Sequence, residues 1–394
     1  MDEIVRIGVI GIGNMGTAHA MNIYQNKVKG LKLVAVCDVD QERLVWAKEN
    51  LEMDVEIYKD YHELLGSDTV DAVLVATPHP SHPFIVEAAC KLGKHVITEK
   101  PAGIDVKTVN HMNEVAKKSN VVFGIMYNQR TNPLYAQLRQ YYQSGALGRL
   151  IHFNWIISNW YRTDAYYASG SWRATWDGEG GGVLMNQCPH NLDIWQWITG
   201  MPVRVKAFCH QGKFHPIAVE DAAEIYVEYE NGAIGYFQTS TGEYPGTNRL
   251  ELSASKGKAV IENGKLTIQL LKQDLHQFTE ESEEYMPALE VEEKVFIQKQ
   301  PESAHIGILQ NFTDAILKNE PLIAPGEEGI MGLSIANAAY LSSWTGDFVE
   351  LPLDENKYFE WLCRKQNCQH SKNLNKKSPS IIGDEYSERW KVKW

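Results

Sequence analysis

A glycine-rich hexapeptide near the start, Gly-Ile-Gly-Asn-Met-Gly at 11–16, constrains the fold more than any other feature. It follows the apolar run 4–10, which predicts a buried strand, and precedes a helical pattern over 17–24. In such a setting Gly11 permits a tight turn and Gly13 lets the backbone approach a pyrophosphate, which the helix N-terminus then stabilises. The segment therefore predicts a dinucleotide-binding βαβ unit.

The second predicted strand supplies an acid where such a unit would bind ribose. The run 33–37 ends at Asp38, 22 residues after Gly16. A carboxylate there can accept both ribose hydroxyls of the adenosine and repels a 2′-phosphate. The spacing favours NAD over NADP, although the nearby Arg43 complicates that preference. The alternative is a solvated aspartate beside a structural glycine turn.

Further apolar runs alternate with helix-length segments through the first third of the chain. They lie at 31–37, 72–76, 95–97 and 121–125. Strands that alternate with helices imply parallel βαβ units and a sheet covered on both faces. We predict an α/β, doubly wound Rossmann domain over residues 1–126.

Two of these strands end in unusual polar segments. Ala76-Thr77-Pro78 leads into a proline-rich stretch that contains His82, and Glu99-Lys100-Pro101 follows the next strand. Ligands of open α/β sheets bind at the carboxyl ends of the strands, so a lysine fixed there by a proline is a candidate catalytic group. The alternative is an exposed Lys–Glu pair of little consequence.

Composition excludes several classes of function. The 394 residues carry a net charge of −12, which argues against nucleic acid as a main partner. No apolar run approaches the roughly 18 residues that cross a bilayer, and the N-terminus begins acidic, unlike a signal peptide. The six cysteines show no disulfide framework, and Cys363, Cys368 and His370 match no common zinc spacing. We therefore expect a cytoplasmic protein without membrane contact or a metal site.

The motifs also occur in a recognisable order. Gly11-x-Gly13-x-x-Gly16, Ala76-Thr77-Pro78 and Glu99-Lys100-Pro101 precede Gly180-Gly181-Gly182, which His190 and Asp193 follow. This set, spread over residues 4–355, resembles the Gfo/Idh/MocA oxidoreductase superfamily, which includes glucose–fructose oxidoreductase and inositol dehydrogenases. The resemblance implies NAD(P)-dependent oxidation or reduction of sugars and polyols. It also implies a second α+β domain at 127–355 with a large, mostly antiparallel open sheet and closing helices at about 303–345.

The expected chemistry centres on a lysine and a histidine. The segment 183–199 reads as one helix, with Asn186, His190 and Asp193 on one face and a kink or start at Pro189. The resemblance implies that Lys100 and His190 lie beside the nicotinamide. A neutral His190 would take the hydroxyl proton, while protonated Lys100 would stabilise the alkoxide and keep the imidazole neutral.

One residue departs from the family pattern. The other site residues follow from the motifs, except that Asn128 and Arg130 are implied by the resemblance, which puts them near nicotinamide and substrate. Inositol-dehydrogenase-like members have aspartate where this chain has Asn186, which cannot stabilise an imidazolium. An aromatic run over 155–176 could stack on sugar faces or pack in the core. The residues expected to bind cofactor are Gly11, Gly13, Asn14, Met15, Asp38, Arg43, Thr77, Pro78, His82, Glu99, Lys100 and Asn128. Those expected to bind substrate are Lys100, Arg130, Trp172, Arg173, Asn186, His190 and Asp193.

Three functions from different classes remain open at this stage. The first is an NAD-dependent dehydrogenase of a sugar, glycoside or polyol. The second is a glycoside-cleaving enzyme that oxidises, eliminates and re-reduces within one cycle. The third is a non-catalytic dinucleotide-binding regulator, which the presence of both Lys100 and His190 disfavours. Open sheets of this kind pair face to face, so we expect a dimer or tetramer. The extension 356–394, with terminal Trp390 and Trp394, is interpreted as a strap across the subunit or its neighbour.

Overall fold

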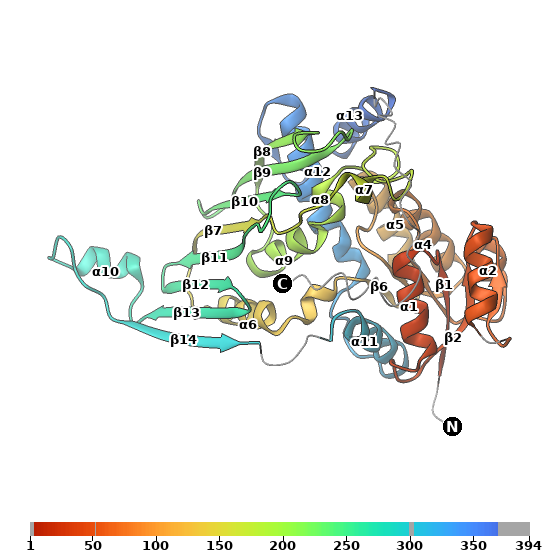
Figure 1. Ribbon diagram of the computed structural model, residues 1–394. Helices are drawn as coiled ribbons and strands as arrows, with labels where there is room; N and C mark the ends of the chain where they lie inside the picture. The colour runs from red at the N-terminus through yellow and green to blue at the C-terminus, as the bar shows by residue number, and fades with distance from the viewer. Residues whose placement is uncertain (1–3, 52, 299–302, 369–394) are drawn as a thin grey trace.

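The first part of the chain folds around a parallel sheet, sheet A. The computed structural model describes residues 4–51, 53–298 and 303–368. Sheet A has the spatial order β3-β2-β1-β4-β5-β6 (Figure 1). The order reverses between β1 and β4, so the loops that follow these two strands diverge and leave room for a ligand. The strands are β1 (Val5–Ile10), β2 (Leu31–Cys37), β3 (Glu56–Tyr58), β4 (Ala72–Val75), β5 (His95–Thr98) and β6 (Phe123–Ile125).

Helices follow most of these strands and cover the sheet. Every residue of β4 is fully buried, because a parallel strand with helices on both faces has no solvent side. The predicted Rossmann fold is therefore confirmed. The helices are α1 (Asn14–Tyr24), α2 (Gln41–Asn50), α3 (Tyr61–Gly66), α4 (His82–Lys91) and α5 (Val106–Lys118), with short 3-10 turns at His79–Ser81 and Asn128–Thr131.

The second part is built on sheet B, whose order is β14-β13-β12-β11-β7-β10-β9-β8-β15. Its described strand pairs are antiparallel apart from the parallel pair of β7 and β10, so the predicted mostly antiparallel sheet is also confirmed. The strands are β7 (Leu150–Ile157), β8 (Arg204–Gln211), β9 (Glu220–Glu228), β10 (Ile234–Ser240), β11 (Asn248–Ala254), β12 (Gly257–Glu262), β13 (Lys265–Leu271), β14 (Val291–Ile297) and β15 (Val349–Glu350).

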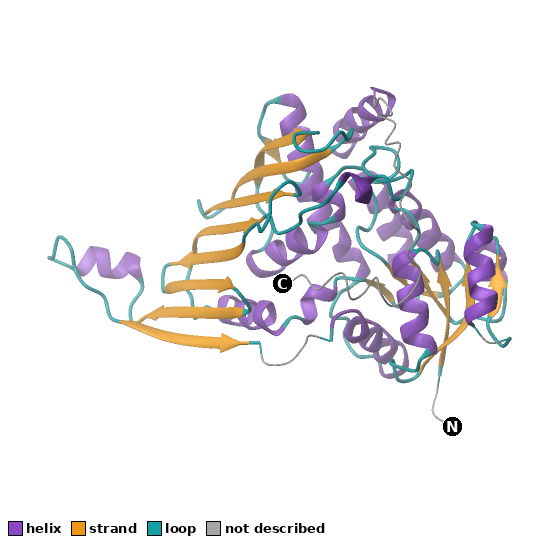
Figure 2. Ribbon diagram, viewed as in Figure 1, coloured by secondary structure: helices purple, strands orange, loops and turns teal. Residues whose placement is uncertain are grey.

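A layer of helices separates sheet B from the Rossmann part (Figures 1 and 2). Trp195 of α9 stacks on Phe153 of β7 and on Phe237 of β10, at ring-centroid distances of 5.5 and 5.9 Å. The helix α12 contacts β8 on one side and α5 on the other, so it joins the two parts. We propose that the domains meet near residue 126, after β6. The helices of the second part are α6 (Pro133–Gln143), α7 (Asp164–Tyr167), α8 (Val183–Asn186), α9 (Pro189–Thr199), α10 (Leu275–Glu281), α11 (Ala304–Lys318), α12 (Gly329–Thr345) and α13 (Glu355–Cys368), with a 3-10 turn at Gly326–Glu328.

The predicted helix over 183–199 is two helices in the structure. It is broken into α8 and α9, and Pro189 begins the second because a residue without an N–H fits the first turn. In sheet B, β12 and β13 form a hairpin that turns at Asn263-Gly264, both of positive φ. The closing helices α11 and α12 agree with prediction.

The start of the C-terminal extension is a helix on the body of the protein. Tyr358 and Leu362 of α13 are buried, and Trp361 stacks on Trp344 of α12. Sequence reasoning did not predict this helix. The rest of the extension, with Trp390 and Trp394, lies outside the described residues, so the strap remains a prediction.

Candidate active site

The glycine loop after β1 has the geometry that a dinucleotide requires. Gly11 has a φ of 88°, and a Cβ on it would lie 2.8 Å from the carbonyl group of Ala76. A Cβ on Gly16 would overlap the Gly11 carbonyl oxygen, so α1 packs closely against the loop. A Cβ on Gly13 would meet nothing within 4 Å. The loop is therefore held by its outer glycines and open at its middle one, beside Asn14 and Met15, which are half-buried at the start of α1.

Asp38 and Arg43 lie beside this loop. One carboxylate oxygen of Asp38 accepts the Ile12 N–H at 2.8 Å, and the other accepts the Asp40 N–H at 2.9 Å. The carboxylate thus fixes the loop as well as marking the end of β2. Arg43, on α2, has a buried Nη1 with no hydrogen-bond partner.

The loops after β4 and β5 are tied together by His82. Its ring nitrogens lie 2.6 Å from the Thr77 carbonyl and 2.8 Å from the Pro101 carbonyl, and the residue is completely buried. The prediction that His82 contacts the cofactor is corrected, because the imidazole is enclosed and both nitrogens face main-chain oxygens. It instead holds Thr77 and Pro78 against the segment that carries Lys100.

Glu99 also requires a correction. It is buried, with Oε1 2.7 Å from His19 Nε2 and Oε2 accepting the Lys100 N–H at 3.1 Å. Its hydrogen bond to His19 and the nearby cations lower its pKa far below the usual range, although burial opposes this. Glu99 is thus ionised and supports the segment that carries Lys100, because both of its carboxylate oxygens bind groups of the protein itself.

Lys100 and His190 are brought to the same place from the two parts of the chain. Lys100 Nζ donates to the main-chain oxygen of Asn186 at 2.8 Å. Burial lowers the pKa of Lys100, and Glu99 and Glu179 oppose that effect. Burial and the Lys100 charge lower the pKa of His190 well below its ordinary range. The predicted neutral imidazole is supported in direction, with burial as the larger cause.

Asn128 provides a test of whether a cofactor fits. It follows β6, is buried, and its Oδ1 has no hydrogen-bond partner. A buried amide oxygen without a partner is costly unless a ligand or water satisfies it. Together with the open glycine loop, this oxygen fits a bound dinucleotide that runs from Gly13 toward Lys100.

Arg130 and Asp193 were predicted to bind substrate, and the structure assigns them elsewhere. The Arg130 guanidinium binds both Asp193 oxygens, at 2.6 and 2.8 Å, and also binds Glu328 and the Ile323 carbonyl. The Arg130 and Asp193 side chains are each 1% exposed. The pair joins η2 (Asn128–Thr131) to α9 and is an internal support for His190, one turn away on the same helix.

This pair predicts a large stability effect. Arg130→Met is expected to lower the free energy of unfolding by about 3–5 kcal/mol, because it leaves the Asp193 carboxylate buried without a counter-ion. Glu328→Gln is the matched control, since its carboxylate is 38% exposed, and it is expected to cost less than about 1 kcal/mol. Urea titrations followed by tryptophan fluorescence measure both. Equal midpoints for the two variants would contradict the assignment.

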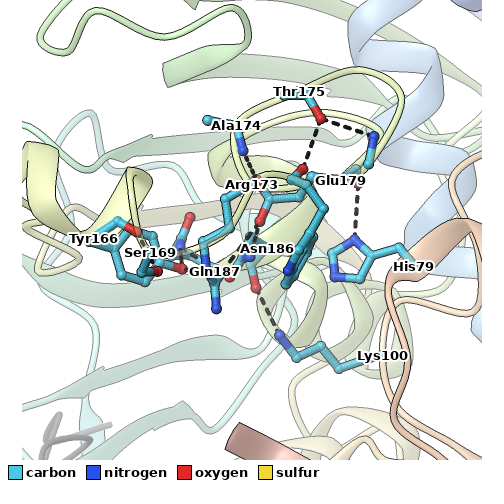
Figure 3. Close-up of polar contacts among 12 residues, drawn as sticks. His79, Lys100, Tyr166, Ser169, Arg173, Ala174, Thr175, Glu179, Asn186 and Gln187 are labelled. Atoms are coloured by element: carbon cyan, nitrogen blue, oxygen red, sulfur yellow. Dashed lines mark hydrogen bonds and ion pairs between the residues drawn. The ribbon is translucent and has the colours of Figure 1, made fainter. Parts of the chain in front are cut away.

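Trp172 and Arg173, which were expected to bind substrate, pack against His79 and Tyr166 respectively. The Trp172 ring meets His79 edge-on, with 5.3 Å between the ring centroids. The Arg173 guanidinium lies 4.6 Å from the centre of the Trp172 ring and 4.8 Å from that of Tyr166. Figure 3 shows Arg173 and Tyr166 beside Asn186. The aromatic run over 155–176 was expected either to stack on sugar or to pack in the core, and several of its members do pack in the core. Its core members, each at most 4% exposed, are Trp155, Trp160, Tyr167 and Trp176.

Sequence reasoning missed two residues beside Asn186. Glu179 is 2% exposed, and its carboxylate accepts a hydrogen bond from Asn186 Nδ2 (Figure 3). His79 donates from Nδ1 to the Glu179 carbonyl at 2.9 Å. Asn186 itself brings no carboxylate to this position, but Glu179 of another segment places one in contact with it. The available signals were a histidine between two prolines and an acid between two glycines.

The three glycines at 180–182 allow close contacts with neighbouring segments of the chain. A Cβ on Gly181 would overlap the Tyr340 hydroxyl, and one on Gly182 would overlap the Glu220 main-chain oxygen. The Glu220 carboxylate accepts the Gly182 and Leu184 N–H groups, each at 2.9 Å. These glycines let α8 approach β9 and α12, which places Asn186.

The described residues contain neither a membrane-spanning helix nor a cluster of metal ligands. No helix there is long and apolar enough to cross a membrane. No group of three or more His, Cys, Asp or Glu side chains in the same part of the chain could hold a metal ion. Cys363 and Cys368 lie on α13, and His370 lies outside the described residues.

A glycine loop that leads, across the ends of parallel strands, to a half-buried lysine and a buried histidine is typical of nicotinamide-dependent oxidoreductases, and the fold and the site place the chain in that class. Two family models define it more closely. Residues 5–127 match the oxidoreductase family with an NAD-binding Rossmann fold, and residues 135–260 match the GFO/IDH/MocA C-terminal domain. The chain belongs to the Gfo/Idh/MocA oxidoreductase family, and its Rossmann domain is an NAD-binding domain.

Individual proteins show the same relationship. The myo-inositol 2-dehydrogenase of Thermotoga maritima is 29% identical over 343 residues, which is 85% of this chain and 95% of that protein. Levoglucosan dehydrogenase in complex with NADH and levoglucosan has a similar structure, with a TM-score of 0.74 at 19% identity over 89% of this chain and all of that one. The WlbA dehydrogenase of Bordetella pertussis, with NADH and UDP-GlcNAcA, has a TM-score of 0.74 at 22% identity over the same shares. At these identities the structures support the fold.

Proposed function

We propose that this protein is an NAD-dependent dehydrogenase of a sugar, glycoside or polyol, with His190 as acid–base and Lys100 as its electrostatic partner. The observation that carries the proposal is the convergence of a half-buried lysine and a buried, neutral histidine where the glycine loop would direct a nicotinamide. The polar side chains around them suit a substrate rich in hydroxyls. They are His79, Tyr166, Arg173, Asn186 and Gln187. The relatives named for inositol and levoglucosan support the same substrate class.

The residues divide the reaction between them. When bound, NAD accepts the hydride from the carbinol carbon. His190, which its low pKa keeps neutral, takes the hydroxyl proton. Lys100 is fixed by the Asn186 carbonyl and has two further ammonium hydrogens, one of which can donate to the substrate oxygen as negative charge develops on it. In the reducing direction, His190 returns the proton.

A substrate panel tests the proposal directly. The purified protein is mixed with NAD, or separately with NADP, and with myo-inositol, scyllo-inositol, levoglucosan and common hexoses, and absorbance is followed at 340 nm. We expect turnover of at least one compound and a higher kcat/KM with NAD, because Asp38 would repel a 2′-phosphate. Folded, NAD-binding protein that turns over nothing in either direction would overturn the dehydrogenase assignment. Release of an aglycone without net NADH would favour the glycoside-cleaving alternative.

We also propose that the outer face of sheet B pairs with a second copy of the chain. This face combines exposed apolar side chains, such as Phe208 at 61% and Tyr236 at 51% exposure, with charges of both signs in one shallow groove. The groove contains Lys206 and Arg249 beside Glu224 and Glu251, which allows a self-complementary contact.

This pairing predicts a change of molecular mass. The unaltered chain is expected to be a dimer or tetramer by light scattering, and Phe208→Glu with Tyr236→Glu to shift it toward monomer, because two charges would be buried without partners. Tyr285→Glu is the control, since that side chain is exposed in the loop after α10. A monomeric unaltered chain, or an assembly that survives both changes, would contradict the pairing.

A further inference from the structure

Glu179 is the point where several parts of the site meet. It lies in the irregular segment between α7 and α8, flanked by Gly178 and Gly180. One carboxylate oxygen accepts the Ala174 N–H at 2.7 Å, and the other accepts from Asn186 Nδ2 and lies 3.7 Å from Arg173 Nη1. Figure 3 shows this carboxylate between Arg173 and Asn186, with His79 on its main-chain oxygen. Glu179 is only 2% exposed, and its polar atoms are all bonded to neighbouring groups, so its position is fixed by the surrounding structure.

Asn186 connects Glu179 to Lys100. Its amide orientation is fixed, because Nδ2 faces the carboxylate while Oδ1 accepts from the Tyr166 hydroxyl and from Gln187 Nε2, both at 3.1 Å. Its main-chain oxygen accepts from Lys100 Nζ at 2.8 Å. A change at Glu179 would release the Asn186 side chain and so disturb the carbonyl that aims the ammonium.

Glu179 also acts on Lys100 through its charge. Burial raises the pKa of Glu179, and Arg173, the Ala174 N–H, Asn186 and Lys100 oppose that effect. Burial is likewise the main effect that lowers the pKa of Lys100, Arg173 adds to it, and the Glu99 and Glu179 carboxylates oppose both. Glu99 is already engaged by His19 and by the Lys100 main chain, so Glu179 is the acid on the substrate-domain side. The titratable and charged groups that influence or are influenced by Lys100 are Glu99, Glu179, Arg173, Cys188, His79, His82, His190 and His305.

We propose that Glu179 is a positioning residue for the reaction: its carboxylate orients Asn186 and keeps Lys100 a protonated hydrogen-bond donor aimed at the substrate oxygen. This rests on the proposed dehydrogenase function and deepens it. Inositol-dehydrogenase-like proteins carry an aspartate at the position of Asn186, on α8. In this chain the carboxylate beside that position comes from Glu179, in the glycine-rich segment before α8. Because Glu179 and Asn186 are in direct contact, the charge can be moved from one to the other with little change in the positions of neighbouring atoms.

The first experiment moves that charge. Glu179→Gln is expected to reduce kcat about 10- to 100-fold, with a smaller change in KM. Losing a negative charge disfavours the ammonium, so the alkaline limb of the kcat/KM profile should move to lower pH by about one unit. Asn186→Asp alone should also be impaired, because it places two carboxylates in contact. The double variant with Glu179→Gln and Asn186→Asp restores one carboxylate, and we expect it to recover most of the rate and the alkaline limb.

A matched control separates positioning from structural support. Glu220→Gln alters a buried acid that caps α8 through the Gly182 and Leu184 N–H groups and that does not contact Asn186. It is expected to lower the urea midpoint without moving the alkaline limb. If Glu179→Gln behaves in the same way, or the double variant recovers nothing while remaining folded, Glu179 is only a structural residue and the inference is wrong.

A second readout needs no substrate. Competitive acetylation of lysines over a range of pH, followed by peptide mass spectrometry, reports the pKa of Lys100 in the whole protein. Glu179→Gln should lower that pKa and the double variant should restore it, whereas an unchanged pKa in Glu179→Gln would overturn the inference. Because this result is independent of turnover, a protein that oxidises no compound in the panel would refute the proposed function and still leave the role of Glu179 decided.

Discussion

Replacing His190 with alanine is expected to reduce kcat by about 10³-fold while NADH still binds. His190 is 7% exposed on α9, and burial and the Lys100 charge keep its pKa well below the ordinary range. It is therefore a proton acceptor across the neutral range, and alanine leaves the hydroxyl proton without a positioned base. Steady-state rates at 340 nm and NADH fluorescence titrations measure the two effects separately.

The pH profile provides a further check on His190. A base with a lowered pKa loses activity only when the pH falls through that low value, so the unaltered enzyme should show no acid limb near pH 6.5. Exogenous imidazole should restore part of the activity of His190→Ala. The control is His276→Ala, an exposed histidine on α10, far from the site (Figure 1). If His190→Ala kept more than about a tenth of the rate, the proton would have to leave by another group.

The parts of the site that the sequence predicted are those fixed by local backbone rules. Gly11 has the positive φ that its motif requires, and Asp38 lies beside the loop because β1 and β2 are neighbours in a parallel sheet. Lys100 is at the end of β5 for the same reason. Each of these positions follows from one strand, one turn and the pairing of adjacent strands, which a short window of sequence determines.

The wrong predictions share a different cause. Asn186 and Asp193 were placed on one face of one helix, but the chain breaks before Pro189 and α9 begins with a new phase. Asp193 pairs with Arg130, which is 63 positions away in the sequence. Helical spacing shows which residues share a face of a helix, but not which distant residue that face contacts. Glu179 lies in an irregular segment without periodicity, so its contact with Asn186 depends on tertiary packing alone. The prediction that His82 contacts the cofactor was wrong because the sequence does not distinguish a buried imidazole from one that faces a ligand.

Replacing Lys100 with methionine, which keeps the length of the side chain and removes its charge, is expected to lower kcat/KM by about 10²- to 10³-fold. The substrate oxygen would lose the donor that Asn186 now aims, and the fall should appear mainly in kcat because the ammonium interacts most strongly with a developing alkoxide.

Removing the charge also has a consequence for His190 that a general loss of structure would not produce. Lys100 contributes to the low pKa of the imidazole, so that pKa should rise in Lys100→Met and the acid limb of kcat/KM should move to higher pH. Lys117→Met is the matched control, since Lys117 is an exposed lysine in the last turn of α5. The decisive measurement is kcat/KM for the unaltered enzyme and both variants from pH 9.5 down to the lowest pH at which they stay folded. A Lys100→Met enzyme that is slow but has an unmoved acid limb would mean that the two groups do not interact, and that the lysine acts on the substrate alone.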